Sequence, residues 1–433
     1  MNKPEAAKLA LVPTALVLSV LVALWPALPA LDSAVIGDGG DNYQFLGFQY
    51  LAHRLAAAGR FPFGWTDLWR YPYGIEFQSP SDSTLVILFG LVLYPLLGDP
   101  IRVYNVSVIG LVAANVSLSY LAFRAWFRPA VALLGAILFG LSFYSLGKIG
   151  GHVNLIPTAG FALSASAVYR IHVERASPAS LARLVLACLV VAFSSLQHPL
   201  LVAGSLPFLA ALALAFFPAA SADFVRTLWR RRLAVALSAA ALVGAFSLFH
   251  GRKLAEAARG EVVLPPETIV SVPAVNFVVA NRYLATVASL VSNSTRPWIE
   301  YTVFFGYVEI VLFAVALSRL ERSRLQWSLV AGTALFCWLS LGLWPYEYLF
   351  RHMPYRGIIE PGRFSTFAYL GMTILILLFL DRIKRNWLLL LTGVLLMAER
   401  LPCNFHLSPT HRDPELVAAV RSRPTRAVLD LPA

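Results

Sequence analysis

Charged side chains are scarce in this 433-residue chain, at 13%, whereas 58% of its residues are hydrophobic. The mean hydropathy is +0.69. A chain this apolar has more apolar surface than the core of an ordinary water-soluble protein can bury, which excludes the common soluble folds. Cysteine is also scarce. Cys188 and Cys337 lie inside apolar segments and Cys403 stands alone beyond the last one, which excludes a disulfide framework or a cysteine metal site and argues against redox chemistry.

The net charge of +12 does not indicate nucleic acid as a partner. Lys and Arg fall mainly in short segments between apolar runs, as they do in the cytoplasmic loops of membrane proteins. The composition therefore predicts an all-α polytopic membrane protein with membrane lipids around it.

Several apolar runs are long enough to cross a bilayer as helices, which takes roughly 17 to 25 residues. They cover residues 8–30, 103–123, 130–147, 153–171, 199–217, 232–250, 301–319, 326–344 and 364–381, with shorter candidates at 181–196 and 386–400.

The run from Thr84 to Leu97 is short for a crossing, and basic residues decide its role. If it does not cross, the basic clusters all fall on one side, which the positive-inside bias makes the cytoplasm. The sequence then predicts about eleven crossings in the bacterial inner membrane, the N-terminus inside, and Thr84 to Leu97 lying on the outer surface. The alternative that residues 8–30 form a signal peptide, cut near Ala30, remains open.

This orientation predicts a transmembrane domain over residues 1–400 with three large outer segments. They are residues 31–102, 251–300 and 344–363, and a short outer tail follows at 401–433.

Two acids stand directly behind the first apolar run. Asp38 lies between Gly37 and Gly39, where no capping role is evident, and Asp41 opens a helical stretch over residues 43–58. A carboxylate at a membrane edge is suited to take a proton from an acceptor hydroxyl or to hold a divalent cation that activates it. Metal dependence stays open. For Asp41, the alternative is a purely structural role as the N-cap of that helix.

Aromatic residues accompany the acids of the first outer segment. Trp69, Tyr71 and Tyr73 lie around a Pro-Tyr-Gly turn, and aromatic rings stack on the apolar faces of sugars. We therefore expect them to bind an acceptor or a sugar. The alternatives are a mere turn, and a solvated acidic linker anchored by interfacial aromatics.

Cations and a histidine appear at two other outer positions. Lys148 and His152 flank a Gly-Gly pair, and Arg356 and Arg363 lie on the side where positive charge is unusual. Backbone amides near glycines, ammonium groups and guanidinium forks all suit a phosphate. The alternatives are an interfacial or capping role for His152, and arginines paired with Glu347 or Glu360.

Glu309 lies within a predicted crossing, so we expect it to face the bundle interior or a cavity, where it is a candidate sugar-binding or acceptor-binding group.

The order of these motifs resembles the GT-C superfamily of integral membrane glycosyltransferases. The resemblance rests on Gly37-Asp38, on Tyr71-Pro72-Tyr73-Gly74, on His152, and on Arg356 with Pro361-Gly362-Arg363-Phe364. It covers most of residues 1–400 as a pattern of arrangement rather than as one tight signature.

The resemblance implies a GT-C-like bundle in which a polyprenyl-phosphate-linked sugar is the donor and a lipid or glycan is the acceptor. Asp38 would be the catalytic base or a metal-anchoring carboxylate, with Asp41 as the second candidate, and the late arginines would hold the donor phosphate. Many relatives continue into a sizeable soluble domain. Here we expect only one helix at residues 414–421 and one strand at 427–431, which leaves three alternatives for the acceptor-binding part: it is missing, it is supplied by a partner, or it is unnecessary. A transporter or flippase of lipid-linked glycans and a non-catalytic partner protein are the rival interpretations.

Overall fold

The computed structural model describes most of the chain and places it almost entirely in helices. The described residues are 3–66, 75–76, 84–174, 178–195, 197–258, 269–280, 284, 286–291, 299–319, 321, 323–352, 358–403 and 405–410. The expected helix at 414–421 and strand at 427–431 lie outside them.

The first half of the chain contains eleven of the labelled helical elements. They are α1 (Lys3–Ala23), η1 (Trp25–Ala30), α2 (Gly40–Ala57), α3 (Thr84–Leu97), α4 (Pro100–Phe123), α5 (Pro129–Gly135), η2 (Ala136–Gly140), α6 (Phe143–Lys148), η3 (Val153–Leu155), α7 (Ala159–Glu174) and α8 (Pro178–Ser194).

The second half continues with long helices and short turns of helix. They are α9 (Gln197–Phe216), α10 (Pro218–Arg230), α11 (Arg232–Ala258), η5 (Ala274–Phe277), α12 (Ala288–Val291), η7 (Ile299–Tyr301), α13 (Tyr307–Ser318), α14 (Arg324–Ser340), α15 (Tyr346–Leu349), η9 (Pro361–Phe364), α16 (Ser365–Leu380) and α17 (Asn386–Glu399).

Four helical segments of the described chain are long and apolar enough to cross a membrane. They are Pro100–Phe123, Pro129–Lys148, Gln197–Phe216 and Pro361–Leu380, and several shorter apolar helices accompany them. This agrees with the predicted helical membrane protein. The expected number of eleven crossings remains a prediction.

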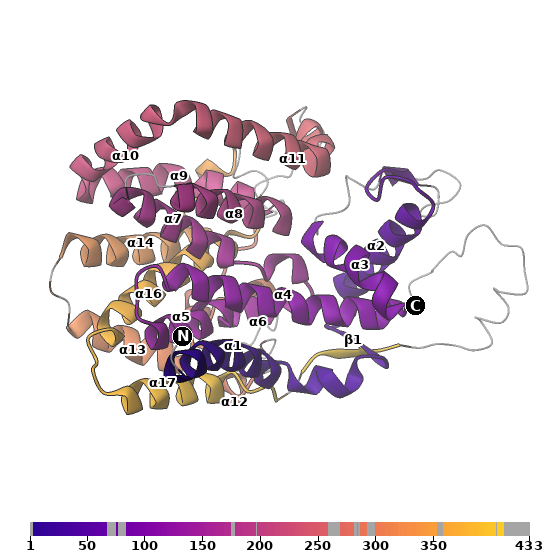
Figure 1. The fold of residues 1–433 in the computed structure, drawn as a ribbon, viewed down its shortest axis with the longest axis horizontal. Coiled ribbons are helices and arrows are strands. Elements are labelled where there is room, and N and C mark those ends of the chain that lie inside the picture. Colours follow the sequence, from indigo (N-terminus) through magenta and orange to yellow (C-terminus); the bar gives the residue numbers. More distant parts are fainter. Residues whose placement is uncertain are drawn as a thin grey trace, which may run out of the picture.

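The helices pack side by side along the long axis of the molecule, and α2 and α3 stand obliquely at one end (Figure 1). Buried apolar side chains form one large cluster around α7, α14 and α16, and a second one among α1, α2 and α4. Both clusters contain side chains of long apolar runs, which is why the runs predicted the bundle.

One helix has the predicted bounds and another begins three residues earlier than predicted. The run from Thr84 to Leu97 forms α3 over those residues, and the stretch expected at 43–58 forms α2. α3 packs against α2 and α4. It lies obliquely to the helices that run along the long axis of the molecule (Figure 1).

Two predicted segments differ from the structure. The run at 301–319 is helical only from Tyr307, because residues 302–306 form a buried irregular segment ahead of it. The basic stretch expected to be a short loop after residue 217 instead forms α10, whose one side packs on α9.

Short strands tie distant parts of the chain together at the end where α2 stands (Figure 1). β1 (Ala34–Ile36) pairs antiparallel with β4 (Leu407–Pro409), and β2 (Trp65–Thr66) pairs with β3 (Ile75–Glu76). The first pair fixes the segment that carries Asp38 to the last part of the described chain.

Candidate functional site

The segment around Asp38 owes its conformation to two glycines. Gly37 and Gly39 have φ of 122° and 100°, values that side-chain-bearing residues rarely adopt. A Cβ on Gly37 would lie 2.2 Å from the side chain of Asn42, so the turn closes tightly over the start of α2. The chain therefore turns sharply at Asp38 just ahead of α2, and both Asp38 and Asp41 are exposed.

Hydrogen bonds anchor this turn on both sides. Gly37 N donates to His406 O at 2.9 Å, and Asp38 N donates to Gly150 O at 2.8 Å. The hydroxyl of Ser408 donates to Gly37 O at 2.9 Å. The acidic turn is thus held between β4 and the glycine pair that precedes His152.

Asn42 completes the anchoring. Its side-chain amide donates to the hydroxyl of Tyr104 at 2.8 Å and to Ile149 O at 3.2 Å, and both bonds are buried. These contacts place the first turn of α2 directly against the segment that carries His152.

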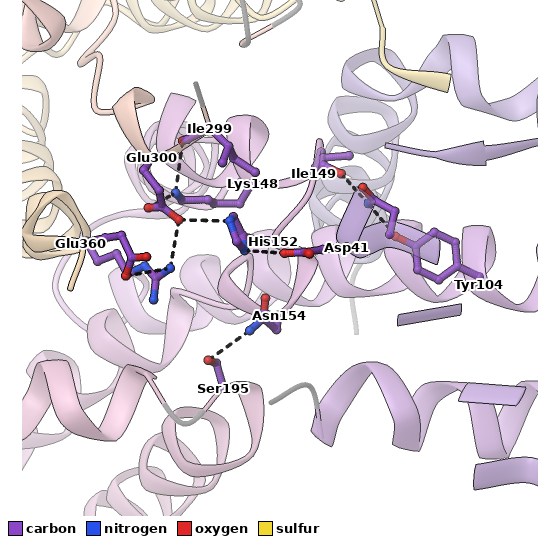
Figure 2. Close-up of polar contacts among 12 residues, drawn as sticks. Asp41, Tyr104, Lys148, Ile149, His152, Asn154, Ser195, Ile299, Glu300 and Glu360 are labelled. Atoms are coloured by element: carbon purple, nitrogen blue, oxygen red, sulfur yellow. Dashed lines mark hydrogen bonds and ion pairs between the residues drawn. The ribbon is translucent and has the colours of Figure 1, made fainter. Parts of the chain in front are cut away.

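Asp41 is not the N-cap of α2. The cap position is Gly39, and no side-chain capping bond is formed there. Instead, Oδ2 of Asp41 lies 3.4 Å from Nδ1 of His152 (Figure 2). The capping explanation for Asp41 was therefore wrong, because helix α2 begins at Gly40, whereas a cap at Asp41 would require it to begin at Asn42, two residues later.

His152 occupies the cap position of η3, but its side chain makes no capping bond. Its Nε2 lies 3.2 Å from Oε1 of Glu300, so both ring nitrogens face carboxylates (Figure 2). Burial lowers the pKa of His152 to about 4, against the opposing effect of Glu300.

Glu300 is the centre of a buried ionic network. Its carboxylate accepts a bond from Lys148 Nζ at 2.8 Å and one from Arg363 at 2.9 Å. The side chains of Lys148, Glu300 and Arg363 are only 1%, 2% and 7% exposed. Arg363 also contacts Glu360 at 3.2 Å, so two buried cations meet two carboxylates.

Close backbone approach brings these groups together. A Cβ on Gly147 would lie 2.6 Å from Thr302, and one on Gly362 would lie 3.2 Å from Glu300 O. The two glycines let α6 and η9 pack directly on the segment around η7. Lys148 and Arg363 follow their glycines by one residue and so reach Glu300 from two sides.

The network sets the protonation of the acids. Burial raises the pKa of Glu300, but Arg363 and Lys148 outweigh it and hold this pKa well below its usual range. Burial raises the pKa of Asp41, and the neighbouring charge of Asp38 adds to that rise. Burial likewise raises the pKa of Glu360.

The structure thus brings together five of the predicted site residues. Asp41, His152, Lys148 and Arg363 join in one network, and Asp38 lies close enough to Asp41 to affect its pKa. The predicted residues Trp69, Tyr71, Tyr73 and Arg356 lie outside the described residues.

Glu309 faces the bundle interior, as expected, but in a different ionic group. It is 1% exposed and pairs with the guanidinium of Arg400, which is fully buried. The neighbouring carboxylate of Glu399 accepts the backbone N–H groups of Tyr307 and Val308 at the start of α13. The sugar-binding role of Glu309 remains a prediction.

Sequence reasoning missed Glu300. It lies at the junction between a polar segment and the apolar run at 301–319, where the sequence pattern indicates only the end of an outer segment. A usable signal was Lys148, because a lysine at the end of a long apolar run needs a carboxylate partner if it is buried.

Within the described residues, no three His, Cys, Asp or Glu side chains are arranged to hold a metal ion. The small cavity lined by Gly150, Thr286 and His406 has a volume of about 20 Å³, room for a water molecule but not for a sugar.

No model of a known protein family matches the sequence, and no curated protein matches it. A function for this chain must therefore be inferred from its own side chains.

Proposed function

We propose that the chain is a GT-C-type glycosyltransferase of the bacterial inner membrane. It moves a sugar from a polyprenyl-phosphate donor to a lipid-linked or surface-glycan acceptor on the extracytoplasmic side. In this proposal about eleven segments cross the bilayer, with the N-terminus inside. The fold supports it to the extent that four described helices have the length and composition of crossings.

One observation carries the proposal. Asp38 and Asp41 are exposed acids of one turn, and Asp41 connects through His152 to a buried ionic network. The side chain of Asp41 is 49% exposed, whereas that of Glu300 is 2% exposed. Such an arrangement offers an acceptor hydroxyl a proton acceptor whose surroundings are rigid.

The proposed reaction is a single displacement with inversion. Asp38 deprotonates or orients the acceptor hydroxyl, with Asp41 as the second candidate for the proton acceptor, and the freed oxygen bonds to the anomeric carbon. The bond from that carbon to the phosphate oxygen breaks, and its electron pair leaves with the lipid phosphate.

The contacts support a limited role for two of the predicted phosphate ligands. Lys148 and Arg363 already pair with Glu300. We therefore propose that their positive charges stabilise the departing phosphate at a distance and that they do not bind it directly. Arg356 remains the predicted direct ligand.

The test uses purified protein and a panel of polyprenyl-phosphate sugars, with mass spectrometry to detect the released lipid phosphate. Asp38→Asn is expected to abolish release while the protein stays folded. Asp32→Asn is the matched control, because Asp32 is an exposed acid of the same segment that pairs with Arg102. Full activity of Asp38→Asn would remove Asp38 from the mechanism.

A second measurement, of lipid-linked glycan movement between leaflets, distinguishes a glycosyltransferase from a flippase. If the reconstituted protein moves lipid-linked glycans between leaflets and releases no lipid phosphate with any donor, the chain is a flippase and the glycosyltransferase proposal is wrong.

A further inference from the structure

His152 is placed between two carboxylates that come from distant parts of the chain. Asp41 belongs to α2 and faces Nδ1, whereas Glu300 belongs to η7 and faces Nε2 (Figure 2). A phosphate would meet two negative neighbours at this ring. The geometry therefore favours a different role for His152 from the phosphate contact expected of it.

The contacts of His152 with Asp41 and Glu300 need more N–H or O–H donors than a neutral imidazole supplies. A neutral imidazole has one N–H, yet both ring nitrogens face a carboxylate oxygen, at 3.4 and 3.2 Å. Only one of these contacts has a donor unless a further proton is present. That proton has two places to reside, on the imidazole ring or on a carboxyl group.

The cations decide which carboxyl group is available. Lys148 and Arg363 both pair with Glu300 and keep it ionised, so it accepts the N–H of Nε2 and fixes that tautomer. The lone pair of Nδ1 then faces Asp41. A further proton taken up from a substrate would consequently be shared by Asp41 and Nδ1, which are both free of it beforehand.

The surroundings also shift the pKa values of the two proton acceptors toward one another. Burial, followed by the charge of Asp38, raises the pKa of Asp41 above its ordinary value of 3.8. Burial lowers the pKa of His152 to about 4. Groups of similar pKa exchange a proton at little cost in free energy.

We propose that His152 is the proton-holding partner of Asp41 in glycosyl transfer. This inference rests on the proposed function. Asp41 takes the proton of the acceptor hydroxyl as its oxygen attacks the anomeric carbon and the lipid phosphate leaves with the electron pair. Asp41 then passes the proton to Nδ1 of His152, and the resulting positive charge is balanced by Glu300, which acts as a positioning residue. The proton finally returns through Asp41 to water.

The first test needs no substrate. Histidine side chains are labelled with ¹⁵N, the His152 signal is assigned with His152→Gln, and its titration is followed by NMR. We expect Nε2 to carry the proton at pH 7. Asp41→Asn removes the facing negative charge and is expected to move the titration midpoint of His152 to lower pH, whereas Asp32→Asn leaves it in place. An Nδ1–H tautomer, or identical titrations in wild type and Asp41→Asn, would overturn the proton-sharing pair.

The second test measures turnover. His152→Gln, confirmed as folded by the remaining histidine signals, is expected to lower kcat by roughly 100-fold with a nearly unchanged KM and to alter the pH profile. A kcat and a pH profile equal to those of wild type would overturn the relay. Because the NMR experiment is independent of turnover, it tests the Asp41–His152 pair even if no donor is turned over, an outcome that would count against the proposed function alone.

Discussion

Replacing Glu300 by Gln tests the centre of the ionic network. The substitution keeps the shape of the side chain but removes the charge that Lys148 and Arg363 share. Arg363 then keeps Glu360 as a carboxylate partner, whereas Lys148 loses the carboxylate with which it pairs. Breaking a buried ion pair by removing one partner costs about 3 to 5 kcal/mol, since the other charge stays buried.

We expect Glu300→Gln to lower the free energy of unfolding by about 3 kcal/mol or more, because the side chain faces two buried cations at 2.8 and 2.9 Å. The measurement is reversible unfolding of the purified protein in mixed micelles. Asp223→Asn is the matched control. It breaks an ion pair with Arg226 whose side chains are 62% and 70% exposed, and such pairs contribute about 1 kcal/mol or less. Equal losses in the two variants would refute the idea that Glu300 organises this region.

Three further predictions follow from the same contacts. Gly37→Ala places a Cβ 2.2 Å from the Asn42 side chain and should cost about 2 kcal/mol or more, measured by unfolding, whereas Gly59→Ala, also at positive φ but in open space, should cost less. Ser408→Ala removes the 2.9 Å bond to Gly37 O, so we expect a loss of about 1 kcal/mol and slower sugar transfer in the release assay. Because burial lowers the pKa of His152 to about 4 from 6.5, the unfolded chain binds more protons than the folded one between these pH values. Stability should therefore rise with pH across that window, by roughly 1.4 kcal/mol per unit at most, and unfolding at several pH values should show a flatter rise for His152→Gln.

The sequence predicted the helical architecture where apolar runs are long and uninterrupted. Thr84 to Leu97 forms α3, and the run at 364–381 forms α16 with η9 ahead of it. The prediction failed at 301–319, where composition alone does not distinguish a helix from a buried irregular segment. Residues 302–306 are buried there without being helical, and α13 begins after Gly306, whose φ is 90°.

The sequence also did not predict the pairing of β1 with β4. Each strand has three residues, which is too short for an alternating pattern to be recognised. Its consequence is large, since this pairing and the Ser408 hydroxyl hold the turn in front of Asp38. Local sequence patterns indicate the acidic turn but not the distant strand β4 that holds it in place.

The candidate site shows the same division between local and distant information. Asp41 and His152 each attracted attention because of their residue type and neighbours, but their contact spans more than a hundred residues and depends on Asn42 and Gly150. The sequence assigned the two residues to different tasks, one to the acceptor and one to the phosphate. Their contact, with Glu300 behind it, instead favours one shared task, because an imidazole between two carboxylates is better suited to hold a proton than to bind an anion.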